Sequence, residues 1–254
     1  MTHRSITAIS IFSVLIAIFL FASAPASGQS VPASAAVPTM PVFIVIGFVG
    51  GFVKHDNPVH SEVQLAALLR KAYPSGVNVE TFESYHGGKA RKKIMDLLDT
   101  DHNGALTLEE KQNARIILYG HSWGGSEAVA TARELGKTNI PVLLIIQVDS
   151  ISKIHHEDVV VPANVARAAN FYQPNGIFHG ASRIRAADPT RTQIIGNFKF
   201  DYKTSPYNCS KYPWYDRMLA KQHTQIECDP SVWKRAESLI KAELPAGREK
   251  GPQE

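Results

Sequence analysis

The chain has 254 residues, of which 44% are hydrophobic and 20% charged, so it can bury a core and lacks the composition of a disordered protein. Lys and Arg total 27 against 23 for Asp and Glu, and this small excess, without a long basic run, does not favour nucleic acid as the main partner. Two cysteines are too few for a cysteine-rich zinc module or a disulfide-dense miniprotein.

The first 28 residues have the pattern of a secretory signal peptide. Arg4 precedes an apolar stretch at 6–22, and small residues follow, with suitable cleavage sites after Ala26 and Gly28. The stretch is shorter than the ~20 residues that span a bilayer, which favours cleavage over an uncleaved anchor. We therefore expect a secreted or periplasmic protein with no stable membrane anchor after cleavage.

Residues 41–244 are predicted to form one α/β domain, between a linker at 29–40 rich in Pro, Ala and Ser and a polar tail at 245–254. Apolar runs predict strands at 42–46, 77–82, 115–119, 142–148, 168–172 and 193–198. Helices are predicted from a Ser61 cap to before Pro74, and at 89–98, 126–135 and 231–244. This alternation predicts a mostly parallel sheet of about six strands with helices on both faces.

Export changes what the two cysteines are expected to do, because thiols pair in an oxidising compartment. We predict one disulfide, between Cys209 and Cys228. Two unrelated buried thiols are the alternative.

The segment Gly120-His121-Ser122-Trp123-Gly124 has the form G-x-S-x-G and lies between a predicted strand and a predicted helix. A sharp strand-to-helix turn exposes the serine hydroxyl, and small residues on both sides allow the backbone to form it. Ser122 is therefore a candidate nucleophile, and a plain tight turn is the alternative.

With this motif in this setting, residues 41–244 resemble the α/β-hydrolase family, in particular its lipase, esterase and thioesterase branches. The resemblance implies an α/β-hydrolase-like fold and an oxyanion hole that includes the backbone N–H of Trp123. It implies a second donor in the glycine-rich segment 47–51, at the N–H of Phe48 or Val49. Such preorganised donors contribute roughly 3 to 4 kcal/mol each, and a mere glycine-rich turn is the alternative.

The family order of serine, acid and histidine implies His223 as the base, since it follows the last predicted strand and precedes the last predicted helix. Asp149, directly after the strand at 142–148, is the implied acid. Many family members place the acid after the following strand. Residues 172–176, at that position here, contain no carboxylate, so Asp188, which is the next one along the chain, is the second choice. The predicted disulfide would close the loop that carries His223 and limit its freedom.

Residues 99–110 match the pattern D-x-[DN]-x-[DN]-G-x5-E at every fixed position and resemble an EF-hand calcium loop. The hard oxygen donors of such a loop suit Ca²⁺. The resemblance implies as ligands Asp99, Asp101, Asn103, the Ala105 carbonyl, Thr107 directly or through water, and both oxygens of Glu110. Only 108–114 separate the loop from the next strand, so a lone structural site is expected, with a metal-free acidic turn as the alternative.

These motifs together predict an exported serine hydrolase that cleaves a small-molecule or lipid carboxylic ester or thioester through an acyl-enzyme. No redox or phosphate-binding motif is visible, so no organic cofactor is expected. The alternative is a secreted calcium-binding module that keeps the hydrolase scaffold without turnover. The sequence does not favour any one oligomeric state.

Overall fold

The computed structural model describes residues 40–154 and 156–246. The predicted signal peptide, the linker up to residue 39 and the end of the predicted tail lie outside these residues. In the part that is described, no helix has both the length and the apolar character needed to cross a membrane.

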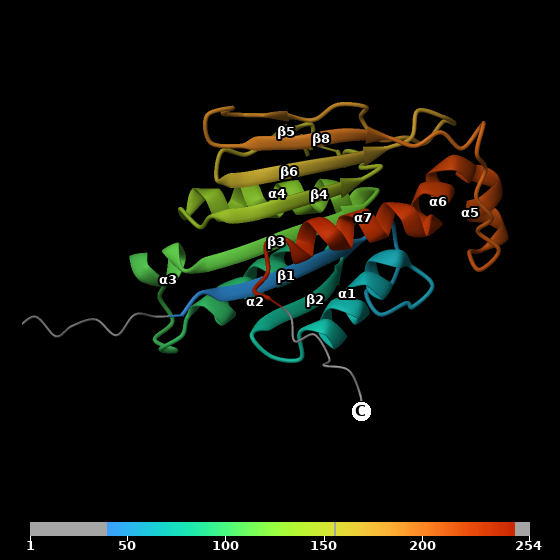
Figure 1. Ribbon diagram of the computed structural model, residues 1–254. Coiled ribbons are helices and arrows are strands. Elements are labelled where there is room, and N and C mark those ends of the chain that lie inside the picture. The colour runs from blue at the N-terminus through green and yellow to red at the C-terminus, as the bar shows by residue number, and fades with distance from the viewer. Residues whose placement is uncertain (1–39, 155, 247–254) are drawn as a thin grey trace, which may run out of the picture. The chain divides into compact units, whose positions relative to one another are not determined.

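Six strands form one sheet, and every neighbouring pair in it is parallel (Figure 1). Their order across the sheet is β2-β1-β3-β4-β6-β8. The strands are β1 (Val42–Val49), β2 (Val77–Glu83), β3 (Ala114–His121), β4 (Val142–Val148), β6 (Val165–Tyr172) and β8 (Gln193–Lys199). Two short strands, β5 (Val160–Val161) and β7 (Arg185–Ala186), form a separate parallel pair. The predicted mostly parallel sheet of about six strands is confirmed.

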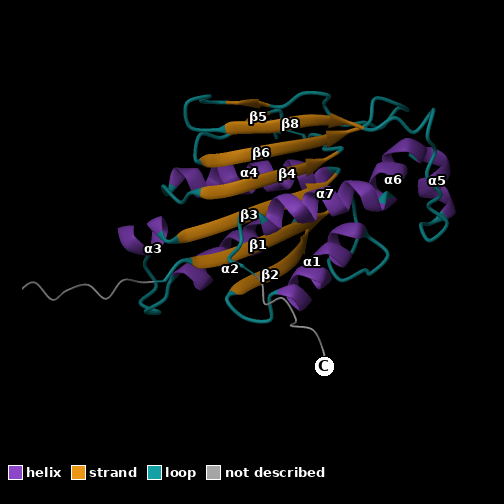
Figure 2. Ribbon diagram, viewed as in Figure 1, coloured by secondary structure: helices purple, strands orange, loops and turns teal. Residues whose placement is uncertain are grey.

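Helices cover both faces of the sheet (Figure 2). One face packs against α1 (Ser61–Ala72) and α7 (Pro230–Lys241), and the other against α2 (Gly87–Leu98) and α4 (Trp123–Lys137). Three shorter helices are α3 (Leu108–Gln112), α5 (Trp214–Leu219) and α6 (Lys221–Cys228). Both faces of the sheet can pack against helices, because successive side chains of a strand point to opposite faces.

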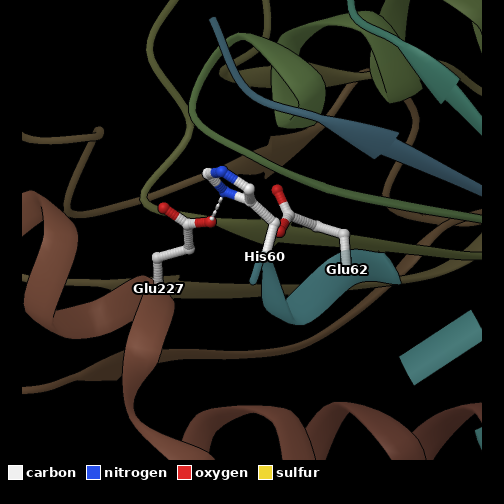
Figure 3. Close-up of side chains that lie close together, drawn as sticks. All are labelled: His60, Glu62 and Glu227. Carbon is white, nitrogen blue, oxygen red and sulfur yellow. Dashed lines mark hydrogen bonds and ion pairs between the residues drawn. The ribbon is translucent and has the colours of Figure 1, made fainter. Parts of the chain in front are cut away.

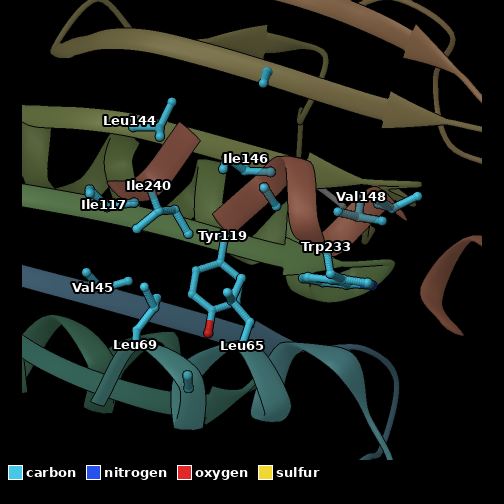
Figure 4. Packing of buried hydrophobic residues seen from close by; sticks show 14 of the residues in the cluster. Val45, Leu65, Leu69, Ile117, Tyr119, Leu144, Ile146, Val148, Trp233 and Ile240 are labelled. Atoms are coloured by element: carbon cyan, nitrogen blue, oxygen red, sulfur yellow. The ribbon is translucent and has the colours of Figure 1, made fainter. Parts of the chain in front are cut away.

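The core has two layers, one on each side of the sheet. In β1, Val45 packs in the layer under α1 and α7, whereas Ile44 and Ile46 pack in the layer under α2 and α4. Figure 4 shows the first layer, with the Tyr119 ring between β3 and α1. The Tyr119 hydroxyl donates a 2.9 Å hydrogen bond to the carbonyl oxygen of Glu62, which satisfies a buried polar group and fixes the start of α1 against the sheet.

Several predicted boundaries differ from the structure, and the end of β1 differs for a clear physical reason. β1 continues to Val49 instead of ending at Ile46, because Gly47 is a paired strand residue opposite Tyr119. A Cβ at Gly47 would lie 2.5 Å from the Tyr119 ring, so glycine is required there by close packing and not by a turn. Helix α1 has His60 as its N-cap, one residue before the predicted Ser61 cap, and makes no side-chain cap hydrogen bond.

Helix α4 begins at Trp123, three residues before its predicted start, and passes through Gly136, where the prediction ended it.

The C-terminal region contains helices that the sequence did not reveal. His223, expected in a loop, lies on α6. Helix α7 begins as predicted after Asp229, whose side chain accepts a 2.8 Å hydrogen bond from the Ser231 N–H. The predicted Cys209–Cys228 disulfide is present, with Cα atoms 5.8 Å apart. It ties the segment before α5 to the end of α6.

Candidate active site

Ser122 lies at the turn between β3 and α4, and its backbone has φ 56° and ψ −127°. This is a strained conformation for a residue other than glycine and costs about 1–3 kcal/mol. The surrounding glycines allow the turn to pack closely: a Cβ at Gly120 would lie 2.4 Å from the backbone of Gly124, and one at Gly124 would lie 2.1 Å from the Phe48 carbonyl oxygen. Gly120 therefore allows close contact within the turn and Gly124 allows close packing against β1, while Ser122 carries the positive φ.

Asp149 follows β4, and its side chain is completely buried. Its Oδ2 is 2.7 Å from Nδ1 of His223 and accepts a 2.8 Å hydrogen bond from Gln173 Nε2. Its Oδ1 accepts hydrogen bonds from the backbone N–H groups of Gly180 (2.8 Å) and Gln173 (3.3 Å). A proton on His223 Nδ1 held by Asp149 leaves Nε2 as the ring atom that can take another proton.

The structure separates the two carboxylates that the sequence left open as the acid. Asp188 lies at an exposed turn and accepts hydrogen bonds from the N–H and the hydroxyl of Thr190, at 2.9 and 2.6 Å. Asp149, and not Asp188, is paired with His223. The sequence reasoning passed over Gln173 because it is not a carboxylate, yet its amide is what orients the Asp149 carboxylate.

A cavity of about 520 Å³ contains both Ser122 and His223 in its lining. The loop after β1 and residues of α5 and α6 form much of its wall. Among the residues described, no hydrogen bond joins the Ser122 hydroxyl to His223, so proton transfer between them requires rotation of a side chain or a bridging water. Such bonds commonly tighten only when substrate is bound.

The expected oxyanion donors fall on different parts of the structure. Trp123 is the first residue of α4, where backbone N–H groups have no partner within the helix. Phe48 and Val49 are fully buried ladder residues of β1, so the prediction that they belong to a loop is wrong. The loop begins at Gly50, and residues 50–53 line the cavity. A second donor from this region would therefore come from a position after Val49.

A second buried cluster, formed by His60, Glu62, His121 and Glu227, adjoins the same cavity. His60 Nδ1 is 2.5 Å from Glu227 Oε1, and His121 Nδ1 lies 3.4 Å from Glu227 Oε2 and 4.0 Å from Glu62 Oε1. The His121 and His223 rings are 4.4 Å apart, which links the cluster to the Asp149–His223 pair. No sequence motif pointed to it, because His60 and Glu227 are 167 residues apart.

Burial governs the ionisation of this cluster. It raises the pKa of Glu62 well above its usual range, and the nearby negative charge of Glu227 adds to the effect. Burial also raises the pKa of Glu227 to about 8. The pKa of His121 is lowered well below its usual range by burial, with the charges of His223 and His60 contributing. The two carboxylates are thus costly to ionise together unless a cation compensates them.

The predicted calcium loop lies between α2 and α3, and Gly104 takes the positive φ of 83° that the sharp turn requires. Carboxylate oxygens of Asp99, Asp101 and Glu110 lie within 4.8 Å of one another. Glu110 also forms a capping box with Thr107, and the backbone hydrogen bond from Thr107 is the largest cause that lowers the Glu110 pKa to about 2. An all-oxygen donor set of this kind fits a hard cation.

Neither a protein-family model nor a curated protein matches this chain. Among solved structures, it is similar to a cutinase-like protein from Cryptococcus sp., with 12% identity, 80% of this chain and 95% of that chain covered, and a TM-score of 0.43. A dienelactone hydrolase from Anabaena variabilis has 12% identity, coverage of 81% and 87%, and a TM-score of 0.39. The RedJ thioesterase of the prodiginine pathway in Streptomyces coelicolor has 9% identity, coverage of 78% and 98%, and a TM-score of 0.37.

Proposed function

We propose that this chain is a serine hydrolase that cleaves a carboxylic ester or thioester through an acyl-enzyme. One observation carries the proposal: a strained Ser122 and a histidine held by a buried carboxylate line the same cavity. The strain and the burial are costs that packing alone does not explain, and costs of this kind concentrate at catalytic sites.

In the proposed reaction, Ser122 Oγ attacks the carbonyl carbon of the substrate while His223 Nε2 takes the hydroxyl proton. The tetrahedral oxyanion accepts hydrogen bonds from the Trp123 N–H and from an N–H of the loop at 50–53. His223 then gives its proton to the departing alcohol or thiol, which leaves the acyl group on Ser122. Water, activated by His223, hydrolyses the acyl-enzyme, and Asp149 keeps the imidazole oriented throughout.

The border of the cavity favours a small-molecule or lipid substrate with an apolar part. Phe52 and Tyr215 line the cavity, and their side chains are 83% and 50% exposed. Exposed aromatic rings at a cavity mouth are suited to an apolar acyl or alkyl group. A panel of p-nitrophenyl esters of graded chain length would measure this preference, and a preference for acetyl over longer acyl groups would contradict it.

Labelling with a fluorophosphonate probe tests the function itself. We expect covalent labelling of the protein, loss of labelling in Ser122→Ala, and retention in Ser126→Ala, a matched control one helical turn along α4. Ester turnover should follow the same pattern. A folded protein that is not labelled would instead support a calcium-binding module on a hydrolase scaffold.

We also propose that residues 99–110 bind one Ca²⁺ that stabilises the connection into β3, the strand that leads to Ser122. The clustered carboxylates of Asp99, Asp101 and Glu110 support this role. Excess Ca²⁺ at about 100 times the dissociation constant would stabilise the fold by about 2.7 kcal/mol, seen as a rise in Tm that chelator reverses. Asp99→Asn, at the position where the pattern allows only aspartate, should lose the rise, while Asp96→Asn, an exposed residue of α2, should keep it. No heat of Ca²⁺ binding in calorimetry would refute the site.

Export remains part of the proposal, with removal of the leader near Ala26 or Gly28. The Cys209–Cys228 disulfide supports an oxidising compartment. Intact-mass measurement of the protein recovered from the exported fraction is expected to show an N-terminus near residue 27 or 29. Retention of Met1 there would contradict cleavage.

A further inference from the structure

Three side chains from two distant parts of the chain converge beside the proposed active site (Figure 3). His60 is the N-cap of α1, Glu62 lies in the first turn of α1, and Glu227 lies near the end of α6. One ligand atom from each lies within 4.8 Å of the others, and all three residues are buried. The side chains of His60 and Glu227 are each 8% exposed, and that of Glu62 is fully enclosed.

The cluster has fewer donors than its two carboxylates need. Glu227 is served by His60 and by the Tyr212 hydroxyl, which lies 3.2 Å from Oε1. Both carboxylate oxygens of Glu62 are buried without any hydrogen-bond partner among the described residues. Buried polar atoms are almost always paired, and a carboxylate left without a donor is among the costliest exceptions. The protein thus leaves a place for a positively charged partner against Glu62.

We propose that His60, Glu62 and Glu227 bind one divalent first-row transition metal ion, at a site separate from the loop at 99–110. Imidazole nitrogen combined with carboxylate oxygen suits zinc and its neighbours, whereas the all-oxygen loop suits Ca²⁺. The charge of the ion would balance the two carboxylates. Ligands of a tetrahedral zinc lie about 3.3 Å apart, so atoms already gathered within 4.8 Å need only small adjustments.

His121 is the neighbour best placed to complete the coordination. Its Nδ1 faces both carboxylates, at 3.4 Å from Glu227 and 4.0 Å from Glu62. Its Nε2 is buried without a hydrogen-bond partner in the part of the chain that the structure describes.

The metal would join α1 to α6. Glu227 lies four residues after His223, so both side chains occupy the same side of α6. An ion held by Glu227 and by the start of α1 would therefore fix the helix that carries His223. Binding of the ion needs neither Ser122 nor any ester, so the site can be tested independently of hydrolysis.

Metal titration of the purified protein, with excess Ca²⁺ present to occupy the loop, tests the proposal. We expect one equivalent of Zn²⁺ in calorimetry, a rise in Tm on binding, and visible absorption typical of bound Co²⁺ when Co²⁺ replaces it. Glu62→Gln and, separately, Glu227→Gln should weaken Zn²⁺ binding by more than about 100-fold, since loss of an outer-shell partner alone typically costs 10–100-fold. The second variant keeps the test valid if the first does not fold.

Glu83→Gln is the matched control. Glu83 is a buried glutamate that also contacts two histidines, His55 and His86, but these three are not among the clusters able to hold an ion in the described residues. We expect it to keep Zn²⁺ binding. Full-strength binding in both Glu62→Gln and Glu227→Gln, or loss only in Glu83→Gln, would overturn the assignment. Absence of binding in the parent protein would also overturn it.

Discussion

Asp149 and Glu62 are both fully buried carboxylates, but the protein surrounds them in opposite ways. Asp149 has four hydrogen-bond contacts, two to each oxygen, from His223, Gln173 and Gly180. Glu62 has none at either oxygen from residues 40–154 and 156–246. The protein's own donors therefore serve both oxygens of Asp149, while Glu62 needs a proton or a cation from outside these donors.

This difference shows how one small region can support two kinds of chemistry. A carboxylate surrounded by fixed donors holds an imidazole in one orientation and in one tautomer. A carboxylate without donors, beside a second carboxylate and two histidines, forms a site that selects for positive charge. The following substitutions test the contrast, from the largest expected effect to the smallest.

Asp149→Asn should lower kcat by about four orders of magnitude, the loss seen when the acid of such a triad is replaced by its amide. The amide would leave the imidazole in the wrong tautomer for accepting the Ser122 proton. Ester turnover at saturating substrate measures the effect, with circular dichroism to confirm folding. A decrease of less than tenfold would show that Asp149 does not orient the base.

The free energy of unfolding should separate the two carboxylates in the metal-free protein. Asp149→Ala leaves the buried donors of Gln173 and Gly180 without a partner and should destabilise the fold by about 3–5 kcal/mol. Glu62→Gln replaces a group that has no partners with a neutral one of the same shape, so we expect a loss of about 1 kcal/mol or less. Urea denaturation in chelator measures both, and equal losses would contradict the contrast.

Gln173→Leu should reduce kcat by about tenfold, because it removes one charge-assisted hydrogen bond of about 1.5 kcal/mol from Asp149. Gln173 acts through Asp149, so the pH dependence of kcat/KM should change as well, which a purely structural defect would not cause. Asn175→Ala is the control, because its side chain contacts Asp201 instead. An unchanged pH profile in Gln173→Leu would exclude a positioning role.

Glu83→Gln should make the fold less sensitive to acid. Burial opposes ionisation of Glu83, but hydrogen bonds from His55 and His86 outweigh it and lower its pKa to about 2. Its folded pKa is below the ordinary value of 4.5, so the stability it adds is present above pH 4.5 and is lost as the pH falls toward 2. Tm of the variant should therefore fall less steeply than that of the parent over this range. Parallel curves would contradict the lowered pKa.

Local patterns predicted much of the sheet. The strand at 142–148 was predicted with both ends correct, because its uninterrupted apolar run fits only a buried strand or helix and is too short for a helix. The end of β1 was missed, since Gly47 ends a strand by its local preference but is required here by the Tyr119 ring from β3. The reason for glycine at position 47 is therefore a packing contact with Tyr119, which is remote in sequence.

The residues of the candidate site also divide into those set by local sequence and those set by long-range contacts. The elbow at Ser122 is a local feature, because adjacent glycines and a strand-to-helix change are all visible within a few residues. Asp149 could be placed next to it because ends of parallel strands gather at one edge of the sheet. That His223 lies on a helix, and that Gln173 supports Asp149, became visible only in the folded chain.

By itself, the sequence determined the alternation of strands and helices, the turn at Ser122, the oxygen-rich loop at 99–110 and the pairing of the two cysteines, since each depends on neighbouring residues or on a single pair. Only the tertiary structure brought His60 and Glu62 to Glu227 and left the Glu62 oxygens without donors from the described residues. The physical reason is that the balance of buried charge is a property of the whole packed interior. No short stretch of sequence contains it.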